Sequence, residues 1–342
     1  MLAARLHDGE HRLRLEQVEV PEPRGNDVLV RVAGAGVCRS DLHVLDGLLR
    51  GLVRLPVTMG HEIAGWVEKA GPEARGVDLG EPVAVMVGWG CGYCEQCVGG
   101  HEQLCAAGIE AGSTADGGFA EFVLVPHRRH LVPLGELDPV TAAPLGDAAL
   151  SAYAAVKRVR PYLQGAAAAV VVGAGGLGQH AIQLLGALAG ASVIAVDVTP
   201  ERLALARALG AGSGILAGPD AAAQILDLAR GHGAGAVIDF VGSDESLSLA
   251  ARIVAPRGAI ALVGLAGGTL PVGFFTLAAE ASLTTVHAGT ILDLHEVVAL
   301  AQRGVLSTRV TTYPLEAVNE ALDDLRAGRV EGRAVVTPPR RS

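Results

Sequence analysis

The chain has 342 residues, of which 46 are glycine, 50% are hydrophobic and 18% are charged. This length exceeds one ordinary domain of roughly 100 to 200 residues and allows a sizeable core without disulfides, and the composition excludes intrinsic disorder. A formal net charge of −9 argues against a large basic surface, so we expect no nucleic-acid partner. Charged residues interrupt the N-terminal segment, which argues against a secretory signal and favours a cytoplasmic protein.

The first predicted strand leads into a segment rich in chemically active side chains. Apolar residues alternate over Val28–Val32, which is typical of a strand. Soon after it, Cys38, Ser40, Asp41 and His43 follow within six residues. We interpret this segment as the edge of a site.

A histidine begins the next apolar stretch. His61 stands between Gly60 and Glu62. Such a histidine alone is more commonly a structural hydrogen-bonding residue than a metal ligand. Together with Cys38, however, it supplies two of the three protein ligands that an open catalytic zinc site requires.

Four of the five cysteines lie within 15 residues, in the spacing Cys-x2-Cys-x2-Cys-x7-Cys with interleaved glycines. This spacing is typical of a lobe that holds one tetrahedral Zn²⁺ in a closed structural site. Local disulfides, free buried thiols and an iron–sulfur cluster are the alternatives. The short spacings are cramped for disulfides, and the bacterial cluster motif ends in Cys-Pro, whereas Ala106 follows the last cysteine here. We predict a structural zinc lobe over residues 88–106, with the ligands Cys91, Cys94, Cys97 and Cys105.

One acidic residue, Asp147, stands in an otherwise apolar segment over 143–151. A buried carboxylate needs a cation or hydrogen bonds, so Asp147 is a candidate third ligand of the open zinc site. The alternative role is the N-cap of a following helix.

The second half of the chain opens with a dinucleotide-binding pattern. A strand over Ala168–Val172 precedes Gly-x-Gly-x-x-Gly, an apolar helix, a second strand and Asp197, which follows the last glycine by 19 residues. The glycines permit a tight turn and close approach of a pyrophosphate to the helix N-terminus, and they argue against a membrane-spanning helix. Asp197 can accept hydrogen bonds from the adenosine ribose and would repel a 2′-phosphate, so NAD is favoured over NADP. The loop residues expected at the pyrophosphate are Gly173, Gly175, Gly176, Leu177 and Gly178.

Further strands are predicted over 236–242, 259–264 and 283–286, separated by helical stretches. Alternating strands and helices predict a parallel, doubly wound sheet with right-handed crossovers. Ligands bind such sheets at the carboxyl ends of the strands. We therefore expect Val241 and Val263 to line a nicotinamide pocket.

Taken in order, these motifs resemble those of the zinc-dependent medium-chain alcohol dehydrogenases along essentially the whole chain. The segment around Asp147 is similar to that of bacterial secondary-alcohol dehydrogenases with an aspartate ligand. The resemblance implies an α/β fold with a mostly β, GroES-like, partly open barrel as catalytic domain over 1–150. It further implies a Rossmann domain with a doubly wound parallel sheet over 151–290 and a return of 291–342 to the catalytic domain.

The resemblance also implies the metal ligands. Cys38, His61 and Asp147 would bind a catalytic zinc. Asp41 and Glu62 would support the ligands from outside, and Glu62 could serve as an alternate ligand. Two zinc ions per chain and NAD are the implied cofactors.

A proton relay and nucleotide contacts follow from the same resemblance. Ser40 would take the proton of the alcohol and His43 would act as the outer base, although His43 could instead be an ordinary surface histidine. Arg39 would contact the pyrophosphate, with a solvated salt bridge as its alternative role. Ser151 and Arg202 would lie at the nicotinamide and the adenosine.

The implied activity is the reversible NAD-dependent oxidation of alcohols, secondary ones in particular, to ketones or aldehydes through a zinc-bound alkoxide and hydride transfer. One alternative is another zinc medium-chain dehydrogenase, acting on polyols, threonine or formaldehyde or reducing aldehydes. An alternative of another class is a zinc- and NAD-binding sensor or structural protein with little turnover. We expect a small-molecule alcohol or ketone as substrate, no nucleic acid or membrane as partner, and a cytoplasmic homo-oligomer, a dimer or tetramer.

Overall fold

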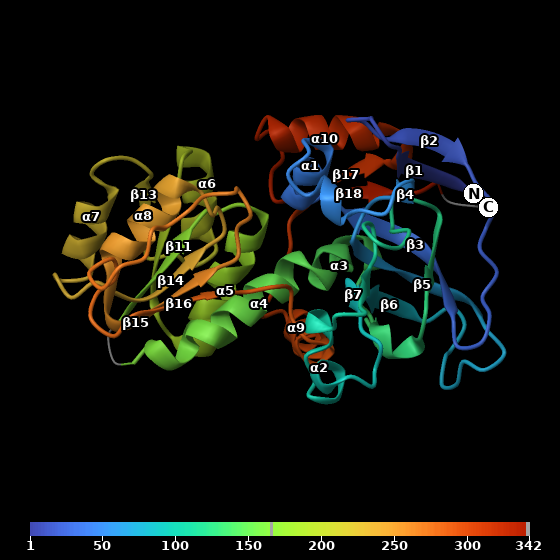
Figure 1. The fold of residues 1–342 in the computed structure, drawn as a ribbon, viewed down its shortest axis with the longest axis horizontal. Coiled ribbons are helices and arrows are strands. Elements are labelled where there is room, and N and C mark those ends of the chain that lie inside the picture. Colours follow the sequence, from blue (N-terminus) through green and yellow to red (C-terminus); the bar gives the residue numbers. More distant parts are fainter. Residues whose placement is uncertain (165–166, 340–342) are drawn as a thin grey trace. The chain divides into compact units, whose positions relative to one another are not determined.

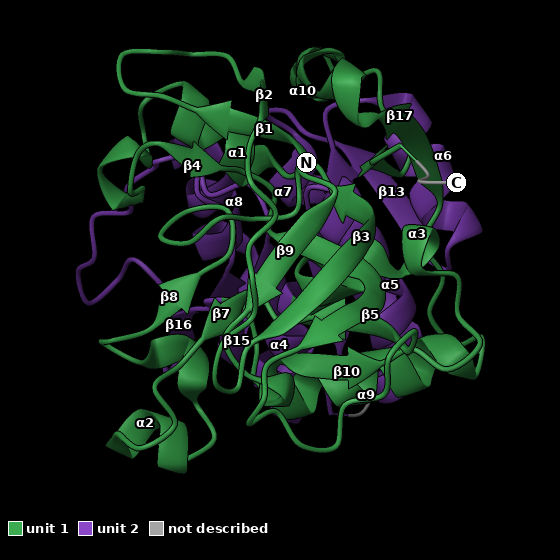
Figure 2. Cartoon of the chain, turned by 90° about the vertical axis from the view of Figure 1, so that its right-hand side faces the viewer, with its two compact units in different colours: residues 1–150, 288–342 green, residues 151–287 purple. Residues whose placement is uncertain are grey.

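The computed structural model describes residues 1–164 and 167–339 and divides the chain into two compact units (Figures 1 and 2). Unit 1 comprises Met1–Leu150 and the chain from Ala288 onward, and unit 2 comprises Ser151–His287. The chain therefore returns to unit 1 after residue 287, whereas the sequence-based boundary was placed after residue 290. We describe each unit by itself.

Unit 2 contains a six-stranded sheet in which every strand is parallel to its neighbours. The order β13-β12-β11-β14-β15-β16 is that of the doubly wound Rossmann fold. Central strands such as β11 are buried along their whole length, because helices cover both faces of a parallel sheet. The strands are β11 (Ala168–Val172), β12 (Ser192–Asp197), β13 (Ser213–Leu216), β14 (Ala234–Asp239), β15 (Val254–Leu262) and β16 (Ser282–Thr285), and the helices are α4 (Ala148–Val159, which begins in unit 1), α5 (Gly176–Ala189), α6 (Pro200–Ala208), α7 (Ala221–Leu228) and α8 (Asp244–Ile253).

Three details of this sheet differ from the sequence-based expectation. Strand β15 spans Val254–Leu262, whereas the sequence predicts a strand over 259–264. The short edge strand β13 was not predicted, because its four residues include a glycine and carry little apolar alternation. Strand β14 ends at Asp239 and not at residue 242, since the Asp239 carboxylate accepts hydrogen bonds from the backbone amides of Val241 and Gly242 and turns the chain.

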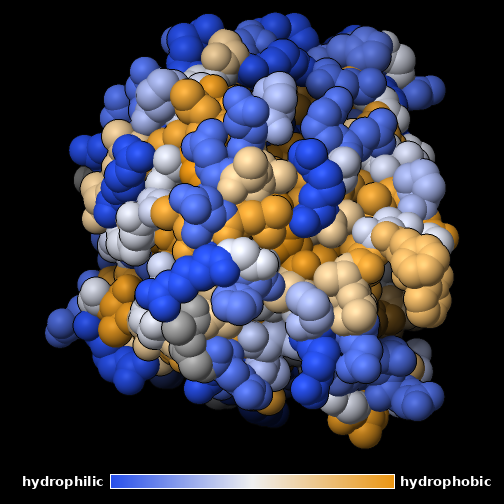
Figure 3. Space-filling view, turned by 90° about the vertical axis from the view of Figure 1, so that its left-hand side faces the viewer, coloured by the Kyte–Doolittle hydropathy of each residue, from blue (hydrophilic) through white to orange (hydrophobic). Residues whose placement is uncertain are grey.

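The surface of unit 2 carries exposed apolar side chains near the edge strand β16, and Figure 3 shows apolar patches interrupting a mainly hydrophilic face. Phe274 and Phe275 are each 92% exposed and Val272 is 77% exposed. All three lie in the segment that leads from β15 to β16.

Unit 1 is mostly β, with its largest sheet in the order β10-β6-β5-β3-β18-β17 and β9 paired to β3. The apolar faces of these strands form one buried cluster that includes Val30, Ile63 and Phe119. The strands of unit 1 are β1 (Leu2–Leu6), β2 (Arg14–Gln17), β3 (Val28–Gly36), β4 (Val57–Thr58), β5 (Glu62–Ala70), β6 (Pro82–Val85), β7 (Gly88–Trp89), β8 (Ile109–Glu110), β9 (Phe122–Val125), β10 (Leu131–Pro133), β17 (Val310–Pro314) and β18 (Arg333–Thr337). Its helices are α1 (Arg39–Leu45), α2 (Glu95–Val98), α3 (Pro139–Ala142), α9 (Ile291–Gln302) and α10 (Val318–Arg326), with short 3-10 turns that include η2 (Glu102–Leu104), η3 (Arg128–His130) and η4 (Ala143–Gly146).

The C-terminal segment completes the large sheet of unit 1. Strand β18 pairs antiparallel with β3, so that Val335 lies opposite Gly36. This pairing brings the start of β18 close to the segment that follows β3. The predicted fold class, a Rossmann sheet joined to a mostly β domain, is confirmed. Among the described residues, no helix has both the length and the apolar character needed to cross a membrane.

Candidate functional site

Three segments of unit 1 bring the side chains of Cys38, His61 and Asp147 together. Cys38 immediately precedes α1, His61 immediately precedes β5, and Asp147 lies between η4 and α4. Asp147 Oδ2 lies 3.9 Å from Cys38 Sγ and 3.5 Å from His61 Nε2. Ligands of a tetrahedral zinc with bonds of roughly 2.0 to 2.3 Å are separated by about 3.3 to 3.8 Å. The donor set therefore fits this ion.

Glu62 belongs to the same cluster, because one ligand atom from each of the four side chains lies within 4.8 Å of the others. Its carboxylate is fully buried and accepts hydrogen bonds from Nε and Nη2 of Arg333, the former at 2.9 Å. Burial would lower the pKa of Arg333, but the charge of Glu62 outweighs this effect and raises it. The guanidinium thus stays charged and holds both oxygens of Glu62.

Asp41 supports the cluster from outside. Its Oδ2 accepts a hydrogen bond of 2.8 Å from the backbone amide of Cys38, and its Oδ1 lies 3.4 Å from His61 Nδ1. Burial would lower the pKa of His61, but the charge of Asp41 and the hydrogen bond with Asp147 raise it well above its usual value. The surroundings of His61 therefore attract a positive charge, either a proton or a metal cation.

The first turns of α1 carry the other predicted site residues of this region. Ser40 Oγ lies 3.2 Å from His61 Nε2, next to the cluster, while Arg39 is exposed. His43 is half-buried, and no hydrogen bond joins it to Ser40 in the described chain. Burial and the charge of Arg39 lower the pKa of His43, against the opposing effect of Asp46. His43 is consequently neutral at neutral pH and able to accept a proton.

The four cysteines of the lobe form a second cluster, also within unit 1. Their sulfur atoms approach in pairs, with Cys91 Sγ 3.9 Å from Cys97 Sγ and Cys94 Sγ 3.7 Å from Cys105 Sγ. Four thiolates at roughly 2.3 Å from one zinc lie about 3.8 Å apart. The sulfur arrangement thus fits a closed tetrahedral ion and has no position left for a substrate.

Electrostatics within the lobe also favour a cation. A hydrogen bond from the backbone amide of Tyr93 lowers the pKa of Cys91 to about 6, whereas burial and the neighbouring sulfurs raise the pKa of Cys97 to about 12. The four thiols therefore do not all ionise at neutral pH without a compensating charge. A divalent cation supplies that charge.

In unit 2, the predicted glycine-rich loop connects β11 to α5. Gly173 has a φ of +88°, and a Cβ at Gly178 would lie 2.0 Å from the carbonyl oxygen of Gly173, so neither position accommodates a side chain without rearrangement. Helix α5 begins at Gly176 with Gly175 as its N-cap, and no side chain of the described residues caps it. Its first amide groups are available to an anion such as a pyrophosphate. Leu177 is half-buried in this first turn.

Asp197 ends β12 and is fixed by three backbone amides. Its Oδ2 accepts from Ala174, within the glycine-rich loop, at 2.8 Å, and its Oδ1 accepts from Val198 at 2.8 Å and Thr199 at 3.3 Å. Arg202 Nη1 lies 3.5 Å from Oδ1. The acid predicted at the adenosine ribose is therefore also hydrogen-bonded to the loop that would hold the pyrophosphate.

The residues predicted at the nicotinamide follow β14 and β15 or begin unit 2. Val241 is 37% exposed beyond the end of β14, and Val263 is half-buried directly after β15. Ser151 is buried in α4. The structure thus places Val241 and Val263 at carboxyl ends of neighbouring strands, where ligands of such sheets bind.

Two buried residues of these sites were missed by sequence reasoning. Sequence reasoning gave Arg333 no role beyond its place in the returning segment 291–342, and gave Asp239 only a place in the predicted strand over 236–242. Asp239 is fully buried and accepts hydrogen bonds from two loop amides and from Ser246 Oγ, the last at 2.7 Å. Their only sequence signal is a charged residue inside an apolar stretch. That signal reveals neither the nearby amides that Asp239 binds nor the partner of Arg333, which lies 271 residues away.

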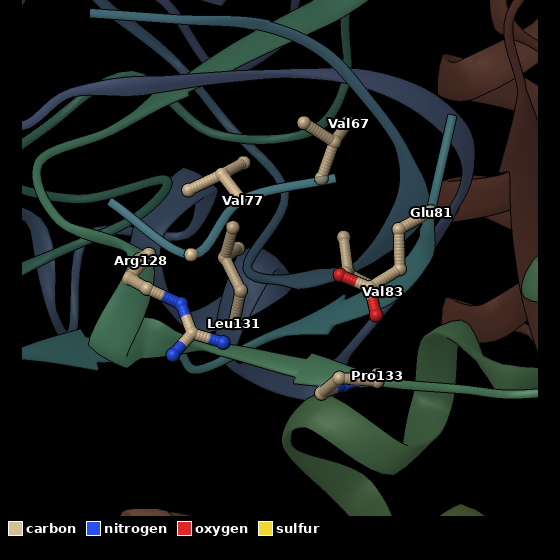
Figure 4. Close-up of a pocket in the computed structure, with 8 residues that line it drawn as sticks. Val67, Val77, Glu81, Val83, Arg128, Leu131 and Pro133 are labelled. Atoms are coloured by element: carbon tan, nitrogen blue, oxygen red, sulfur yellow. The ribbon is translucent and has the colours of Figure 1, made fainter. Parts of the chain in front are cut away.

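A small pocket lies elsewhere in unit 1, where side chains of β5, β6 and β10 converge (Figure 4). Its volume is about 10 Å³, room for roughly one water molecule. None of the residues lining it belongs to either metal-ligand cluster. It is too small to hold an alcohol together with a cofactor. The lining residues are Val67, Gly76, Val77, Glu81, Val83, Arg128, Leu131 and Pro133.

Comparison with known proteins shows the family to which the chain is similar. Residues 24–136 match the family described as alcohol dehydrogenase GroES-like domain, and residues 176–303 match the family described as zinc-binding dehydrogenase. The chain is 39% identical to an NAD-dependent alcohol dehydrogenase of Sulfurisphaera tokodaii, over 99% of this chain and 100% of the relative. It is 37% identical to D-arabinose 1-dehydrogenase (NADP(+)) of Saccharolobus solfataricus, over 98% and 97%. The crystal structure of the alcohol dehydrogenase from Aeropyrum pernix is similar, with a TM-score of 0.94, 37% identity and coverage of 99% of this chain and 100% of the other.

Proposed function

The chain belongs to the zinc-type medium-chain alcohol dehydrogenase family, and we propose that it oxidises alcohols, secondary ones in particular, to ketones or aldehydes with NAD. The observation that carries the proposal is the convergence of Cys38, His61 and Asp147. One ligand atom of each lies within 4.8 Å of the others. Three protein ligands of mixed type leave one coordination position open, as catalytic zinc sites require.

The chain's residues have distinct roles in this reaction. Bound zinc supplies a Lewis acid that lowers the pKa of an alcohol hydroxyl, and bound NAD supplies the hydride acceptor. Ser40 Oγ, next to His61, both donates and accepts hydrogen bonds and so can take the proton of the alcohol. His43, neutral at neutral pH, then holds that proton at its imidazole. Asp41 fixes the orientation of His61 throughout.

The nucleotide is held by unit 2 in this proposal. The glycine-rich loop and the first turn of α5 receive the pyrophosphate, and Asp197 receives the adenosine ribose. Arg202 flanks the adenosine, Val241 and Val263 line the nicotinamide side, and Ser151 packs on it. Arg39, exposed at the start of α1, supplies a positive charge that suits an anion such as a pyrophosphate.

The test combines substrate oxidation with metal analysis. We expect NADH absorbance to rise on addition of 2-propanol, 2-butanol or 1-phenylethanol with NAD. Asp147→Asn and Cys38→Ser should each lose the catalytic zinc and turnover while NADH still binds, because the nucleotide residues lie on other segments. The matched control is Asp220→Asn, which changes an exposed aspartate before α7. Full activity of either ligand variant would disprove the ligand assignment.

A sugar dehydrogenase is the second candidate, favoured by the similarity to D-arabinose 1-dehydrogenase (NADP(+)). Asp197 argues against NADP as the cofactor of such an enzyme, because the buried Asp197 carboxylate would repel a 2′-phosphate. Aldoses and polyols assayed beside secondary alcohols, each with NAD and with NADP, separate the two. A higher kcat/KM for a pentose with NADP would establish the sugar enzyme. If the protein binds zinc and NAD but turns over none of these substrates, it is instead a sensor or structural protein.

We further propose a cytoplasmic homo-oligomer, a dimer or tetramer, in which the free edge of β16 pairs with the same strand of a second copy. Edge strands expose unpaired backbone groups, and the exposed Phe274, Phe275 and Val272 add apolar surface in the segment that leads into β16. No disulfide joins any of the five cysteines, all of which lie in the described part of the chain, and this agrees with a reducing compartment. Light scattering of the wild type and of Phe274→Asp tests the contact. A wild-type monomer, or an unchanged mass in the variant, would exclude it.

A further inference from the structure

The four-cysteine lobe contacts a helix far from it in the sequence. Glu102 lies in η2, between the ligand positions Cys97 and Cys105. Its Oε1 accepts a hydrogen bond of 3.1 Å from the backbone amide of Ile291, a residue 189 positions further along the chain. Ile291 is the first residue of α9.

This contact completes the N-terminus of α9. Thr290 and Asp293 form a capping box, in which the Thr290 hydroxyl accepts from the Asp293 amide and the Asp293 carboxylate accepts from the Thr290 amide. The capping box leaves the amide of Ile291 without a partner inside the helix, and Glu102 accepts its hydrogen bond. A carboxylate at this end also interacts favourably with the helix dipole.

The first turn of α9 lies against the segment that carries a candidate zinc ligand. A Cβ at Gly289 would lie only 2.6 Å from Leu150 Cδ1, so the chain before α9 is packed closely on Leu150. Leu150 is fully buried and follows Asp147 by three residues. Helix α9 also packs against η4, which ends immediately before Asp147.

The lobe has a second attachment, which does not involve Glu102. Arg129, in η3, donates a hydrogen bond from Nη2 to the carbonyl oxygen of Gly90 at the start of the lobe. Its guanidinium also occupies the space beside Gly92. Loss of the Glu102 contact should therefore leave the lobe attached and folded, and free only the start of α9.

We propose that Glu102 is a positioning residue through which the structural zinc lobe steadies Asp147. The connection runs from the lobe to the Ile291 amide, then through the first turn of α9 to η4 and Leu150 on either side of Asp147. The inference rests on the proposed function, since it takes Asp147 as a ligand of the catalytic zinc. Residues that orient a ligand from outside typically change metal affinity by roughly 10- to 100-fold.

The experiment compares two ways of removing one hydrogen bond. Glu102→Ala removes the acceptor, and Ile291→Pro removes the donor at a first helical position, where proline is well tolerated. Their matched controls are Glu102→Gln, which keeps Oε1 as acceptor, and Ile291→Ala, which keeps the amide. Glu95→Ala changes an exposed acid of the same lobe. The readouts are the rate of zinc transfer to a chromogenic chelator and the visible absorption spectrum of cobalt placed in the catalytic site.

We expect Glu102→Ala and Ile291→Pro to release the catalytic zinc roughly tenfold faster than the wild type and to alter the cobalt spectrum. The double variant should release it no faster than either single variant, because both remove the same bond. The three control variants should behave like the wild type. Wild-type release rates and spectra in both test variants would overturn the proposal, as would faster release of the lobe zinc alone.

Failure of the proposed function remains distinguishable in this design. Zinc analysis of Asp147→Asn shows whether that residue holds an ion at all. If Asp147→Asn retains both ions with unchanged release rates, the ligand assignment fails, and with it the inference. If Asp147→Asn loses one ion while Glu102→Ala and Ile291→Pro resemble the wild type, only the inference fails.

Discussion

The guanidinium of Arg333 and the carboxylate of Glu62 form a doubly hydrogen-bonded ion pair, although 271 residues separate them in the chain. Their side chains are 6% and 0% exposed. The pairing of β18 with β3 places the positive charge there, directly beside the Cys38 cluster. Because the ion pair occupies both oxygens of Glu62, it favours metal binding by Cys38, His61 and Asp147 without Glu62.

Removing one member of this ion pair should lower the free energy of unfolding far more than removing both. Arg333→Met leaves a buried, unpaired carboxylate, and we expect the free energy of unfolding to fall by about 3 to 5 kcal/mol. The double variant Arg333→Met with Glu62→Gln contains no uncompensated charge and should recover most of the loss. Urea unfolding of the zinc-loaded proteins measures both values. A single variant within about 0.5 kcal/mol of the wild type would show that the pair is not buried as described.

The sequence predicts sites built from one short segment better than sites built from distant segments. The glycine-rich loop and the four-cysteine lobe are local, with all their residues within short segments, so spacing alone located them. Cys38, His61 and Asp147 come from three distant segments, so their chemistry made them candidate ligands of one open site, and the resemblance to a family strengthened that grouping. Arg333 and the Glu102 contact with Ile291 depend on which strand and helix pack together. Spacing along the chain contains no information about such pairs.

The contact between Asp197 and the glycine-rich loop leads to a prediction about cofactor binding. Asp197→Ala leaves the Ala174 amide without its buried acceptor, which typically costs about 1 to 3 kcal/mol. We expect the loop of the free variant to rearrange so that this amide finds another acceptor. NAD binding must then reverse the rearrangement, so KM for NAD should rise by roughly 5- to 150-fold, with a much smaller change in kcat at saturating NAD. Arg202→Ala removes a partly exposed charge 3.5 Å from the same carboxylate and should raise KM only slightly. Equal effects of the two substitutions would show that the loop contact is unimportant.

The proton relay predicts a specific pH dependence of activity. Burial and the charge of Arg39 lower the pKa of His43. Its imidazole therefore stays neutral, and able to accept a proton, to a pH below the usual histidine pKa of roughly 6.5. Activity should fall as the pH drops through this lowered pKa, since protonated His43 has no acceptor left. Arg39→Ala should move the acid limb of kcat to higher pH and Asp46→Asn to lower pH, both measured at saturating NAD. His43→Asn should lack the limb and retain both zinc ions. An identical acid limb in His43→Asn would exclude His43 from the relay.

The surroundings of a second histidine, His130, predict that the folded state loses stability in acid. His130 is 2% exposed, and burial together with the charge of Arg129 lowers its pKa to about 3. Within the described chain, its Nδ1 has no hydrogen-bond partner, so protonation would leave a buried charge unsatisfied. In the unfolded chain the same group takes up its proton near pH 6.5. Between these two pH values the unfolded state binds one more proton than the native state.

The contribution of neutral His130 is therefore fully present above about pH 6.5 and is lost as the pH falls, by about 1.4 kcal/mol per pH unit. The His130→Gln variant lacks this titrating group. As the pH falls, its free energy of unfolding should therefore decline less steeply than that of the wild type, by about 1.4 kcal/mol per pH unit. Urea unfolding at several pH values between about 6.5 and 4.5 measures the two slopes. Metal ligands titrate equally in both proteins and cancel from the difference. The exposed His232→Gln serves as the control and should keep the wild-type slope. Parallel curves for the wild type and His130→Gln would mean that His130 is accessible to protons in the native protein.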